Sequence, residues 1–444
     1  MGTSGVGKED KMGKFNDLYN AKKTKVENVL SLIKSNEIII SGMACMEPQV
    51  FLSRLHEISG SVRNVEVYTC LNMKNYEFYE KKEYEGTFFN NSWFHNAGIR
   101  NTVKQGIKTV TYVPNNLHES GTNLLSTVTP DYYIGIASPM DEHGFMSLSL
   151  SATYEKDVCE KAKRVILEVN PNAPRTHGDT QIHISQVDYL YEVDYKIPEL
   201  PDAKPTELDE KIAGNIACLV NDGSTIQIGI GGIPNAVAGL LKDKKDLGIH
   251  TEMFTESMID LFEAGAITNN KKTLWPGKAV CTFALGSKKM YEFVNDNPGV
   301  WIMRGKYVND PYIISQNDNM ISVNTALMVD LTGQVCSEAL GNKHYSGTGG
   351  QLDTHRGAVM SKNGKGIIAL ASTTKKGDSK IVPMLPLGSP VTVPRHDLDY
   401  VVTEFGVAHL RGKSVSQRVH ELISISNPEH RETLLKEASV IGLI

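Results

Sequence analysis

The sequence has few cysteines, and they are not arranged as a disulfide framework or a metal site. Six cysteines are scattered along 444 residues, and no two are spaced as CxxC. They are Cys45, Cys70, Cys159, Cys218, Cys281 and Cys336. This usage excludes a small disulfide-stabilised secreted domain, so we expect reduced thiols and a cytoplasmic location.

Long apolar runs are also missing. No stretch approaches the roughly 20 apolar residues that a membrane-spanning helix needs. The segment MGTSGVGKEDKMGKF has neither the apolar core of a secretion signal nor the Arg-rich pattern of an import helix. We therefore expect no membrane partner, and we interpret residues 1–15 as a disordered tail.

Basic and acidic residues occur in similar numbers. The chain has 46 basic and 51 acidic residues, for a formal charge of −5. A global basic surface for nucleic acid is therefore absent, and an anionic ligand would need a local pocket. The 13 histidines form no HExxH motif and no His–Cys ligand spacing, so we expect no metal site. The GxSxG and GxxxxGK[ST] motifs are also absent.

The chain does contain enough apolar material for more than one core, since hydrophobic residues make up 40% of it. At about 150 residues per domain, its length suggests two or three domains. The clearest break is VDYKIPELPDAKPTELDEK, where Pro198, Pro201 and Pro205 cannot continue a helix or a central strand. We therefore expect an N-terminal domain over 16–198 and a C-terminal domain over 199–444.

The two halves share an order of local patterns. In the second half, Thr206–Asp209 fits a capping box, TIQI (225–228) fits a buried strand, and Pro234 fits the first turn of a helix. In the first half, predicted strands at 38–40 and 65–68 flank a turn and a helix in the same order. Strands that alternate with helices favour parallel sheets, so we predict two similar open α/β domains. Chance similarity between two unrelated α/β halves is the alternative.

A glycine-rich turn follows the predicted strand at 225–228. The segment IQIGIGGIPNAV places Gly229–Ile233 between this strand and a helix. Glycine permits close backbone approach, and a helix N-terminus presents free amides, which together suit a phosphate or pyrophosphate. The pattern differs from GxGxxG, so a tight turn without a ligand is the alternative.

A carboxylate follows the next predicted strand, near 247–251. Glu252 lies just past its end, before a helix that carries Met258, Leu261 and Phe262 on one face. Ligands of open α/β sheets bind beyond the carboxyl ends of strands, a position that suits Glu252 for catalysis. Alternatively, Glu252 caps or braces the loop. We interpret His250 as a packed residue at the strand end.

Two further loops combine glycine with polar side chains. In HYSGTGGQLDTHRGAV (344–359), glycine amides can face a developing oxyanion, or Asp353 and Arg356 can brace a structural turn. In VVTEFGVAHLRGKS (401–414), Glu404 follows a predicted strand and precedes a basic cluster. Buried side chains with a purely structural role would give the same pattern.

Together, seven segments from about residue 20 to about residue 440 resemble the acetyl-CoA hydrolase/transferase family, a group of family I CoA-transferases. The resemblance is greatest to its 4-hydroxybutyrate CoA-transferases and butyryl-CoA:acetate CoA-transferases. The segments are SPMDEHGF (138–145), ILEVNPNAPRTHGD (166–179), DGSTIQIGIGGIPNAV (222–237), HTEMF (250–254), VDLTGQV (329–335), SGTGGQLD (346–353) and TEFGVAHLRGKS (403–414).

The resemblance implies roles for particular residues. Glu252 matches the covalent nucleophile of the family. The expected CoA contacts are Gly229, Ile230, Gly231, Gly232, Ile233, Leu327, Gly350 and Lys375. The expected oxyanion donors are the backbone amides of Gly349 and Gly350. The implied fold has two similar α/β domains with the site between them.

The resemblance also implies the reaction. Glu252 attacks an acyl-CoA, forms an acyl-glutamyl anhydride, and then holds CoA as a glutamyl thioester that a second acid discharges. The expected partners are an acyl-CoA, a short-chain carboxylate and, in a homodimer or homotetramer, further copies of the chain. CoA is a substrate here, and no permanently bound cofactor is expected.

Two departures from the family pattern affect substrate choice. Thr255-Glu256-Ser257 stands where relatives often have Ser-Asp-Gly, and Met328 stands where many have Glu. Both place the acyl specificity in question more than the reaction. Two other functions stay open: an acyl-CoA hydrolase that uses the same Glu252, and a ligand-sensing module that binds a phosphorylated metabolite at the glycine turn.

Overall fold

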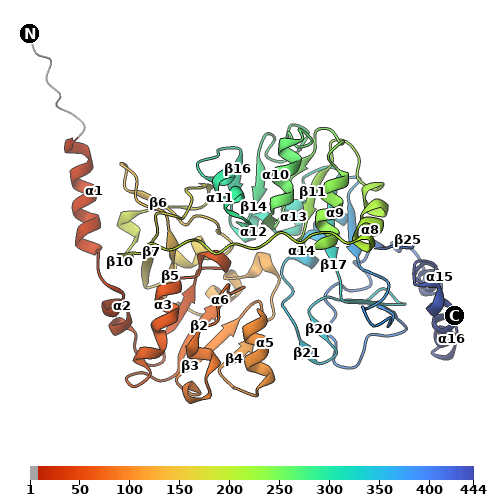
Figure 1. Cartoon of the computed structure of the whole chain (residues 1–444), viewed down its shortest axis with the longest axis horizontal. Helices are drawn as coiled ribbons and strands as arrows, with labels where there is room; N and C mark the ends of the chain where they lie inside the picture. Colours follow the sequence, from red (N-terminus) through yellow and green to blue (C-terminus); the bar gives the residue numbers. More distant parts are fainter. Residues whose placement is uncertain (1–8) are drawn as a thin grey trace, which may run out of the picture. The chain divides into compact units, whose positions relative to one another are not determined.

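The computed structural model describes residues 9–444, which form two compact units (Figure 1). Unit 1 contains the described chain up to Asn115, together with Glu119–Glu199 and Phe283–Arg304. Unit 2 contains Asn116–His118, Leu200–Thr282 and Gly305–Ile444. Residues 1–8 of the predicted tail lie outside the described residues, and helix α1 begins at Glu9.

Unit 1 is built on a seven-stranded sheet whose paired strands are all parallel. Its order is β10 (Tyr189–Glu192), β7 (Arg164–Val169), β5 (Tyr132–Ala137), β1 (Ile38–Ser41), β2 (Val65–Thr69), β3 (Phe88–Ser92) and β4 (Val110–Tyr112). Shorter strands are β6 (Phe145–Ser147), β8 (His177–Gly178), β9 (Gln181–His183), β15 (Phe283–Ala284) and β16 (Val300–Ile302). The interior strand β5 is buried along its whole length, as expected for a parallel sheet with both faces covered.

The helices of unit 1 are α1 (Glu9–Lys22), α2 (Val26–Leu32), α3 (Gln49–Arg54), α4 (Glu77–Glu80), α5 (Ala97–Lys104), α6 (Thr122–Thr127), α7 (Glu155–Cys159) and α11 (Lys288–Val294). Helices α2 and α3 contribute Val29, Phe51 and Leu52 to a core that also contains Ile39 and Val67 from the sheet. The helical periodicity of the sequence therefore marks the faces that pack on the sheet.

Unit 2 is built on a six-stranded sheet of the order β12 (Gly248–Ile249), β11 (Thr225–Ile228), β17 (Met320–Thr325), β22 (Lys365–Ala369), β24 (Tyr400–Thr403) and β25 (Gly406–His409). The strands are parallel except for the β24–β25 pair. Shorter strands are β13 (Met253–Phe254), β14 (Ala279–Cys281), β18 (Met328–Asp330), β19 (Val335–Cys336), β20 (Ala339–Leu340), β21 (Lys343–His344) and β23 (Ile381–Val382).

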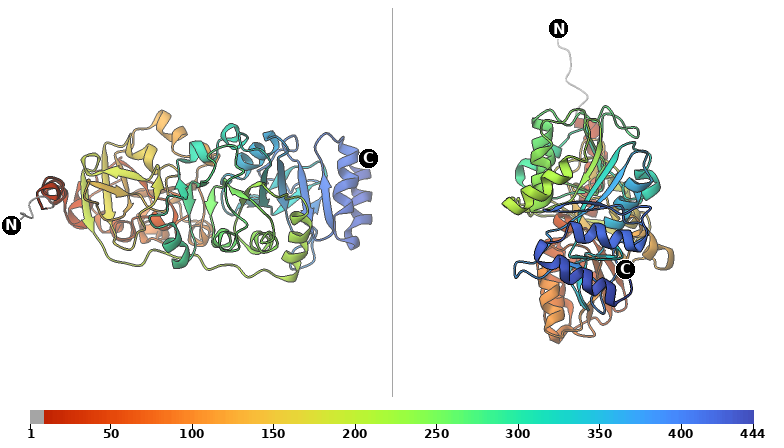
Figure 2. Two further views of the ribbon diagram at one scale, coloured as in Figure 1. Left: turned by 90° about the horizontal axis from the view of Figure 1, so that it is seen from above. Right: turned by 90° about the vertical axis from the view of Figure 1, so that its right-hand side faces the viewer.

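The helices of unit 2 are α8 (Glu207–Ala217), α9 (Gly232–Leu240), α10 (Glu256–Glu263), α12 (Gly305–Val308), α13 (Pro311–Ile314), α14 (Gln351–Met360), α15 (Val415–Ser424) and α16 (Pro428–Val440). Helix α14 packs on β17 and β22. Helices α15 and α16 lie side by side at the C-terminus (Figure 2), and they contribute Val419 and Leu434 to a hydrophobic core of unit 2.

The two sheets share a strand order around their first strands. In unit 1, β1 lies between β2 and β5, and β7 and β10 follow beyond β5. In unit 2, β11 lies between β12 and β17, and β22 and β24 follow beyond β17. This correspondence confirms the prediction of two similar α/β domains with parallel sheets.

The predicted start of α8 is confirmed in atomic detail. The Thr206 side chain accepts from the Asp209 backbone N–H at 3.3 Å, and the Asp209 carboxylate accepts from the Thr206 backbone N–H at 2.9 Å. This capping box satisfies two of the amides that a helix start leaves without partners.

Within residues 9–444, no helix is both long and apolar enough to cross a membrane.

Candidate active site

Most of the predicted site segments follow the carboxyl ends of neighbouring parallel strands of unit 2. Gly229–Ile233 follows β11, Glu252 follows β12, and Leu327 follows β17. Lys375 and Glu404 lie beyond β22 and β24. Parallel strands end at the same edge of a sheet, so the fold gathers segments that are far apart in the sequence at one edge.

Glu252 is held by two donors from unit 2. The Asn309 side chain donates from Nδ2 to Oε2 at 2.9 Å, and the Gly350 backbone N–H also donates to the carboxylate. Asn309 follows α12, and Gly350 immediately precedes α14. The carboxylate therefore lies at the start of α14, where the positive end of the helix dipole favours an anion.

Burial is nevertheless the dominant influence on this carboxylate. Burial, together with the negative charge of Asp353, raises the pKa of Glu252 to about 7, against the opposing effect of the Asn309 and Gly350 donors. A carboxylate with a raised pKa is more basic than one in water. A group with this pKa is about half ionised at pH 7 and mostly ionised at pH 8, so the carboxylate form that can act as a nucleophile is present there.

The structure brings Glu252 together with both predicted oxyanion glycines. A Cβ atom on Gly350 would lie 2.0 Å from Glu252 Oε2 and 2.0 Å from Asn309 Nδ2. A Cβ atom on Gly349 would lie 3.6 Å from Glu252 Oε1, and Gly349 has a φ of +55°. Only glycine at 350 lets its backbone approach the carboxylate this closely.

The predicted glycine turn forms the start of α9. Gly231 has a φ of +118°, a backbone conformation that residues with a side chain rarely adopt. A Cβ atom on Gly232 would lie 2.3 Å from the Asp209 carboxylate. Ile233 is buried, whereas Ile230 is 48% exposed. No hydrogen bond joins Gly229–Ile233 to Glu252, and their contacts with CoA stay a prediction.

Leu327 and Lys375 lie in separate loops of unit 2. The Leu327 backbone N–H donates to the Cys336 carbonyl at 3.0 Å, while Lys375 is exposed in a turn that the Thr374–Asp378 hydrogen bond closes at 2.8 Å. No hydrogen bond or ion pair links either residue to Glu252. Their predicted contacts with CoA also stay predictions.

Several other candidates prove to be braces. His250 is buried, and burial lowers its pKa to about 3; its ring stacks on Trp275 and its Nε2 lies 2.7 Å from the Val308 carbonyl. Glu404 accepts from the backbone and hydroxyl of Ser372 at 2.9 and 2.6 Å. These contacts hold the ends of strands.

Sequence reasoning missed Asn309 and His118. Asn309 is 57 residues from Glu252 in the sequence and belongs to no recognised motif. His118 lies 2.8 Å from Asp353, from which it is separated by 235 residues. Neither contact leaves a local signal, because spacing along the chain does not indicate which loops meet in the fold.

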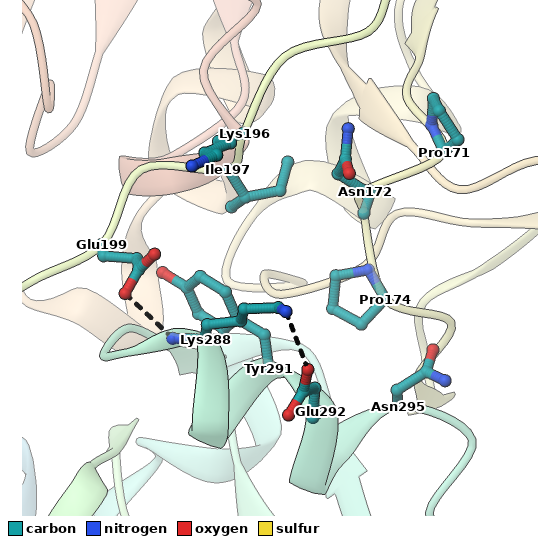
Figure 3. Close-up of a pocket in the computed structure, with 11 residues that line it drawn as sticks. Pro171, Asn172, Pro174, Lys196, Ile197, Glu199, Lys288, Tyr291, Glu292 and Asn295 are labelled. Carbon is teal, nitrogen blue, oxygen red and sulfur yellow. Dashed lines mark hydrogen bonds and ion pairs between the residues drawn. The ribbon is translucent and has the colours of Figure 1, made fainter.

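Unit 1 has a separate surface pocket of about 500 Å³ (Figure 3). Its walls include Pro174, Tyr291 and the Lys288–Glu292 ion pair, whose atoms lie 3.3 Å apart. Glu199 accepts from the Lys288 backbone N–H at 3.0 Å, and no predicted site residue lines the pocket.

Among residues 9–444, no group of three or more His, Cys, Asp and Glu residues could hold a metal, and the six cysteines are all free.

Comparisons with known proteins show the family to which the chain belongs. The family model described as the acetyl-CoA hydrolase/transferase N-terminal domain matches residues 7–200, and the model of the C-terminal domain matches residues 286–438. The chain is 43% identical to a succinyl-CoA:cyclohexane-1-carboxylate CoA transferase of Geobacter metallireducens, over 95% of each chain. It is 42% identical to the 4-hydroxybutyrate coenzyme A transferase of Clostridium kluyveri, over 95% of this chain and 98% of that protein.

A further relative and a solved structure extend the likeness. The butyryl-CoA:acetate CoA-transferase of Anaerostipes caccae is 36% identical, over 96% of this chain and 97% of that protein. The crystal structure of RipA from Yersinia pestis superposes with a TM-score of 0.91 at 38% identity, over 97% of this chain and 100% of that one. The chain is therefore an enzyme, a CoA-transferase, and belongs to the acetyl-CoA hydrolase/transferase family.

Proposed function

We propose that the chain transfers CoA between a short-chain acyl-CoA and a carboxylic acid such as acetate, with Glu252 as the covalent nucleophile. The proposed donors are butyryl-CoA, 4-hydroxybutyryl-CoA and acetyl-CoA. The observation that carries the proposal is the environment of Glu252. Its carboxylate is basic, accepts from two fixed donors, and lies beyond the carboxyl end of a strand.

In the first step, a carboxylate oxygen of Glu252 attacks the thioester carbonyl carbon. The carbon–sulfur bond breaks, CoA leaves as a thiolate, and an acyl-glutamyl anhydride forms. The thiolate then attacks the Glu252 carbonyl carbon, and the anhydride bond breaks. The acyl group departs as a carboxylate, and CoA remains on Glu252 as a thioester.

In the second half of the reaction, the acceptor carboxylate attacks the glutamyl thioester and passes through the same states in reverse. It leaves as its CoA ester, and Glu252 returns as a carboxylate. Because the first product leaves before the second acid reacts, ping-pong kinetics are expected. Every step exchanges one acyl bond for another, so it needs no redox or metal cofactor.

The donors around Glu252 suit the oxyanions of these steps. When the thiolate attacks the Glu252 carbonyl, negative charge develops on a Glu252 oxygen. The Gly350 amide and Asn309 Nδ2 already donate to these oxygens, so they require little rearrangement. Removing one such donor typically lowers a rate by about 10²–10³-fold. Gly349 is the second proposed oxyanion donor.

The proposed CoA contacts lie on the loops of the same sheet edge. The turn Gly229–Ile233 places backbone amides at the start of α9, where anionic groups of CoA can bind. Exposed Lys375 supplies a positive charge for a phosphate, and Leu327 supplies apolar contact. Binding energy from this remote moiety can hold the reacting thioester in place. A cytoplasmic location and a homodimer or homotetramer stay predictions.

An exchange assay tests the proposal. Wild-type protein, Glu252→Gln and the exposed control Glu263→Gln are incubated with butyryl-CoA, and labelled acetate is added or omitted. We expect wild type and Glu263→Gln to form labelled acetyl-CoA, and Glu252→Gln to retain less than a few per cent of this rate. Substantial transfer by Glu252→Gln would overturn the nucleophile assignment. Consumption of butyryl-CoA at the same rate without acetate would indicate a hydrolase.

A further inference from the structure

His118 binds a carboxylate that neighbours the proposed nucleophile. Its backbone N–H donates to Asp353 Oδ2 at 3.1 Å, and its ring Nδ1 lies 2.8 Å from Asp353 Oδ1. The Asp353 side chain is only 2% exposed, whereas that of His118 is 24% exposed. His118 lies in the short 3₁₀ helix Leu117–Glu119, and residues 116–118 are a small insertion from the first half of the chain into unit 2.

Asp353 connects this contact to Glu252 through the start of α14. Gly350, whose amide donates to Glu252, is three residues before Asp353 in the first turn of that helix. The negative charge of Asp353 disfavours the ionised form of Glu252, and together with burial it raises the Glu252 pKa to about 7. The carboxylates of Glu252 and Asp353 therefore both lie at the first turn of α14. His118 contacts both carboxylate oxygens of Asp353.

Helix α14 also carries two basic side chains, those of His355 and Arg356. Arg356 interacts with Asp353, but its guanidinium is bound to both oxygens of Asp397 at 2.9 and 3.0 Å. His355 is buried, and burial lowers its pKa to about 4, so it is neutral near pH 7. His118 is thus the imidazole that directly contacts Asp353 and that also reaches solvent.

We propose that His118 is a positioning residue that acts through Asp353: it holds Asp353 ionised beside Glu252 and so keeps the resting Glu252 carboxylate reactive. This inference rests on the proposed function of Glu252. The charge of Glu252 disappears when the anhydride or the thioester forms, so repulsion from Asp353 is relieved on the way to both intermediates. An interaction that is less unfavourable in the transition state than in the ground state raises the rate of the step.

Three variants test the proposal. Asp353→Asn removes the charge and keeps the shape, His118→Leu removes the ring donor, and their combination forms a double-mutant cycle. The matched control is His177→Leu, since His177 makes a similar contact of 3.0 Å with Asp296 on the surface of unit 1. The readout is the rate at which Glu252 acquires a CoA adduct from butyryl-CoA, followed by peptide mass between pH 5.5 and 9.

We expect both single substitutions to move the acidic limb of this rate profile to lower pH by about one unit, because Glu252 loses a charged neighbour. On the alkaline plateau, where Glu252 is ionised in every variant, we expect Asp353→Asn to slow adduct formation by about 10-fold. We expect His118→Leu to slow it less there, because Asp353 itself ionises as the pH rises. The double variant should match Asp353→Asn. His118→Asn, which keeps a donor near the position of Nδ1, should restore much of the wild-type profile, and His177→Leu should leave it unchanged.

An acidic limb that does not move in Asp353→Asn would overturn the inference, and so would additive effects of the two substitutions. If His118→Leu fails to fold, Asp353→Asn and His118→Asn still decide. The wild-type sample separates this failure from failure of the proposed function. If the wild type forms no CoA adduct on the Glu252 peptide, the nucleophile assignment itself is wrong; if it forms the adduct and the variants leave its pH dependence unchanged, only the role of His118 is wrong.

Discussion

Opposing effects act on the carboxylate of Glu252, the proposed nucleophile. Burial and the charge of Asp353 disfavour its ionised form, while donors from Asn309 and Gly350 favour that form. The balance places its pKa at about 7, so that the carboxylate is basic and still available near neutral pH. Each of these neighbours can be altered separately, which makes the balance testable.

Gly350→Ala should disrupt the site directly. The new Cβ atom would lie 2.0 Å from both Glu252 Oε2 and Asn309 Nδ2, so the carboxylate or the start of α14 must move. We expect loss of at least about 10²-fold in kcat, as for removal of one oxyanion donor, with little change in secondary structure. Gly214→Ala in α8 is the control, because nothing lies within 4 Å of its Cβ position. Equal kcat in the two variants would contradict the geometry.

Asn309→Ala should change the pH dependence of the reaction. The variant loses the 2.9 Å hydrogen bond that favours the charged form of Glu252, so the pKa of Glu252 should rise. A hydrogen bond to a charged group contributes about 1.5–3 kcal/mol, which corresponds to about one to two pH units. In a profile of kcat/KM against pH, the acidic limb should therefore move to higher pH. A limb that stays in place or moves to lower pH would be inconsistent with this role.

The sequence predicted part of this site at the residue scale. Glu252 could be selected because it follows a strand and because its segment resembles a family motif. Gly349 and Gly350 could be selected because their loop is rich in glycine. Asn309 and His118 could not, because each reaches the site through a tertiary contact that leaves no trace in local spacing.

At the scale of elements, the sheet of unit 2 assembles the site by ending its parallel strands at one edge. The apolar run 225–228 and the capping box before α8 predict the corresponding elements closely, since local propensities decide them. No local pattern in the sequence predicts that residues 283–304 return to unit 1. An apolar pattern indicates that an element is buried but not which sheet buries it.

Thr206→Ala tests the contribution of the capping box. The variant loses the side-chain oxygen that accepts from the Asp209 amide, and loss of an N-cap costs about 1 kcal/mol of stability. We expect a lower urea midpoint for the chain and an unchanged kcat, because Thr206 does not contact Glu252. Thr206→Ser keeps the hydroxyl and should unfold like the wild type. A midpoint that does not change in Thr206→Ala would show that the cap contributes little.

At the scale of the whole molecule, the ionisation of Glu252 affects the stability of the fold. Its folded pKa of about 7 exceeds the ordinary value of 4.5, so the folded state holds this proton more tightly than the unfolded state does. The stability that this proton supplies is fully present below pH 4.5 and is lost as the pH rises through 7. Burial of the ionised Glu252 carboxylate therefore lowers the stability of the folded state.

Glu252→Gln should show this effect with the opposite sign, since glutamine has no charge to bury. We expect the variant to be more stable than the wild type by about 1–3 kcal/mol at pH 8, with the difference shrinking toward zero near pH 4. Urea unfolding at several pH values measures the difference. Glu263→Gln, on an exposed position of α10, should show no such trend. A Glu252→Gln variant that is less stable than the wild type at pH 8 would contradict the buried environment.

The most direct test of the central claim is the mass of the protein after brief incubation with butyryl-CoA and no acceptor acid, followed by peptide mapping. We expect a CoA-sized adduct on the peptide that contains Glu252, and we expect acetate to remove it as acetyl-CoA. If butyryl-CoA is consumed and no adduct forms on that peptide, or if an adduct maps to another residue, Glu252 is not the residue that carries CoA.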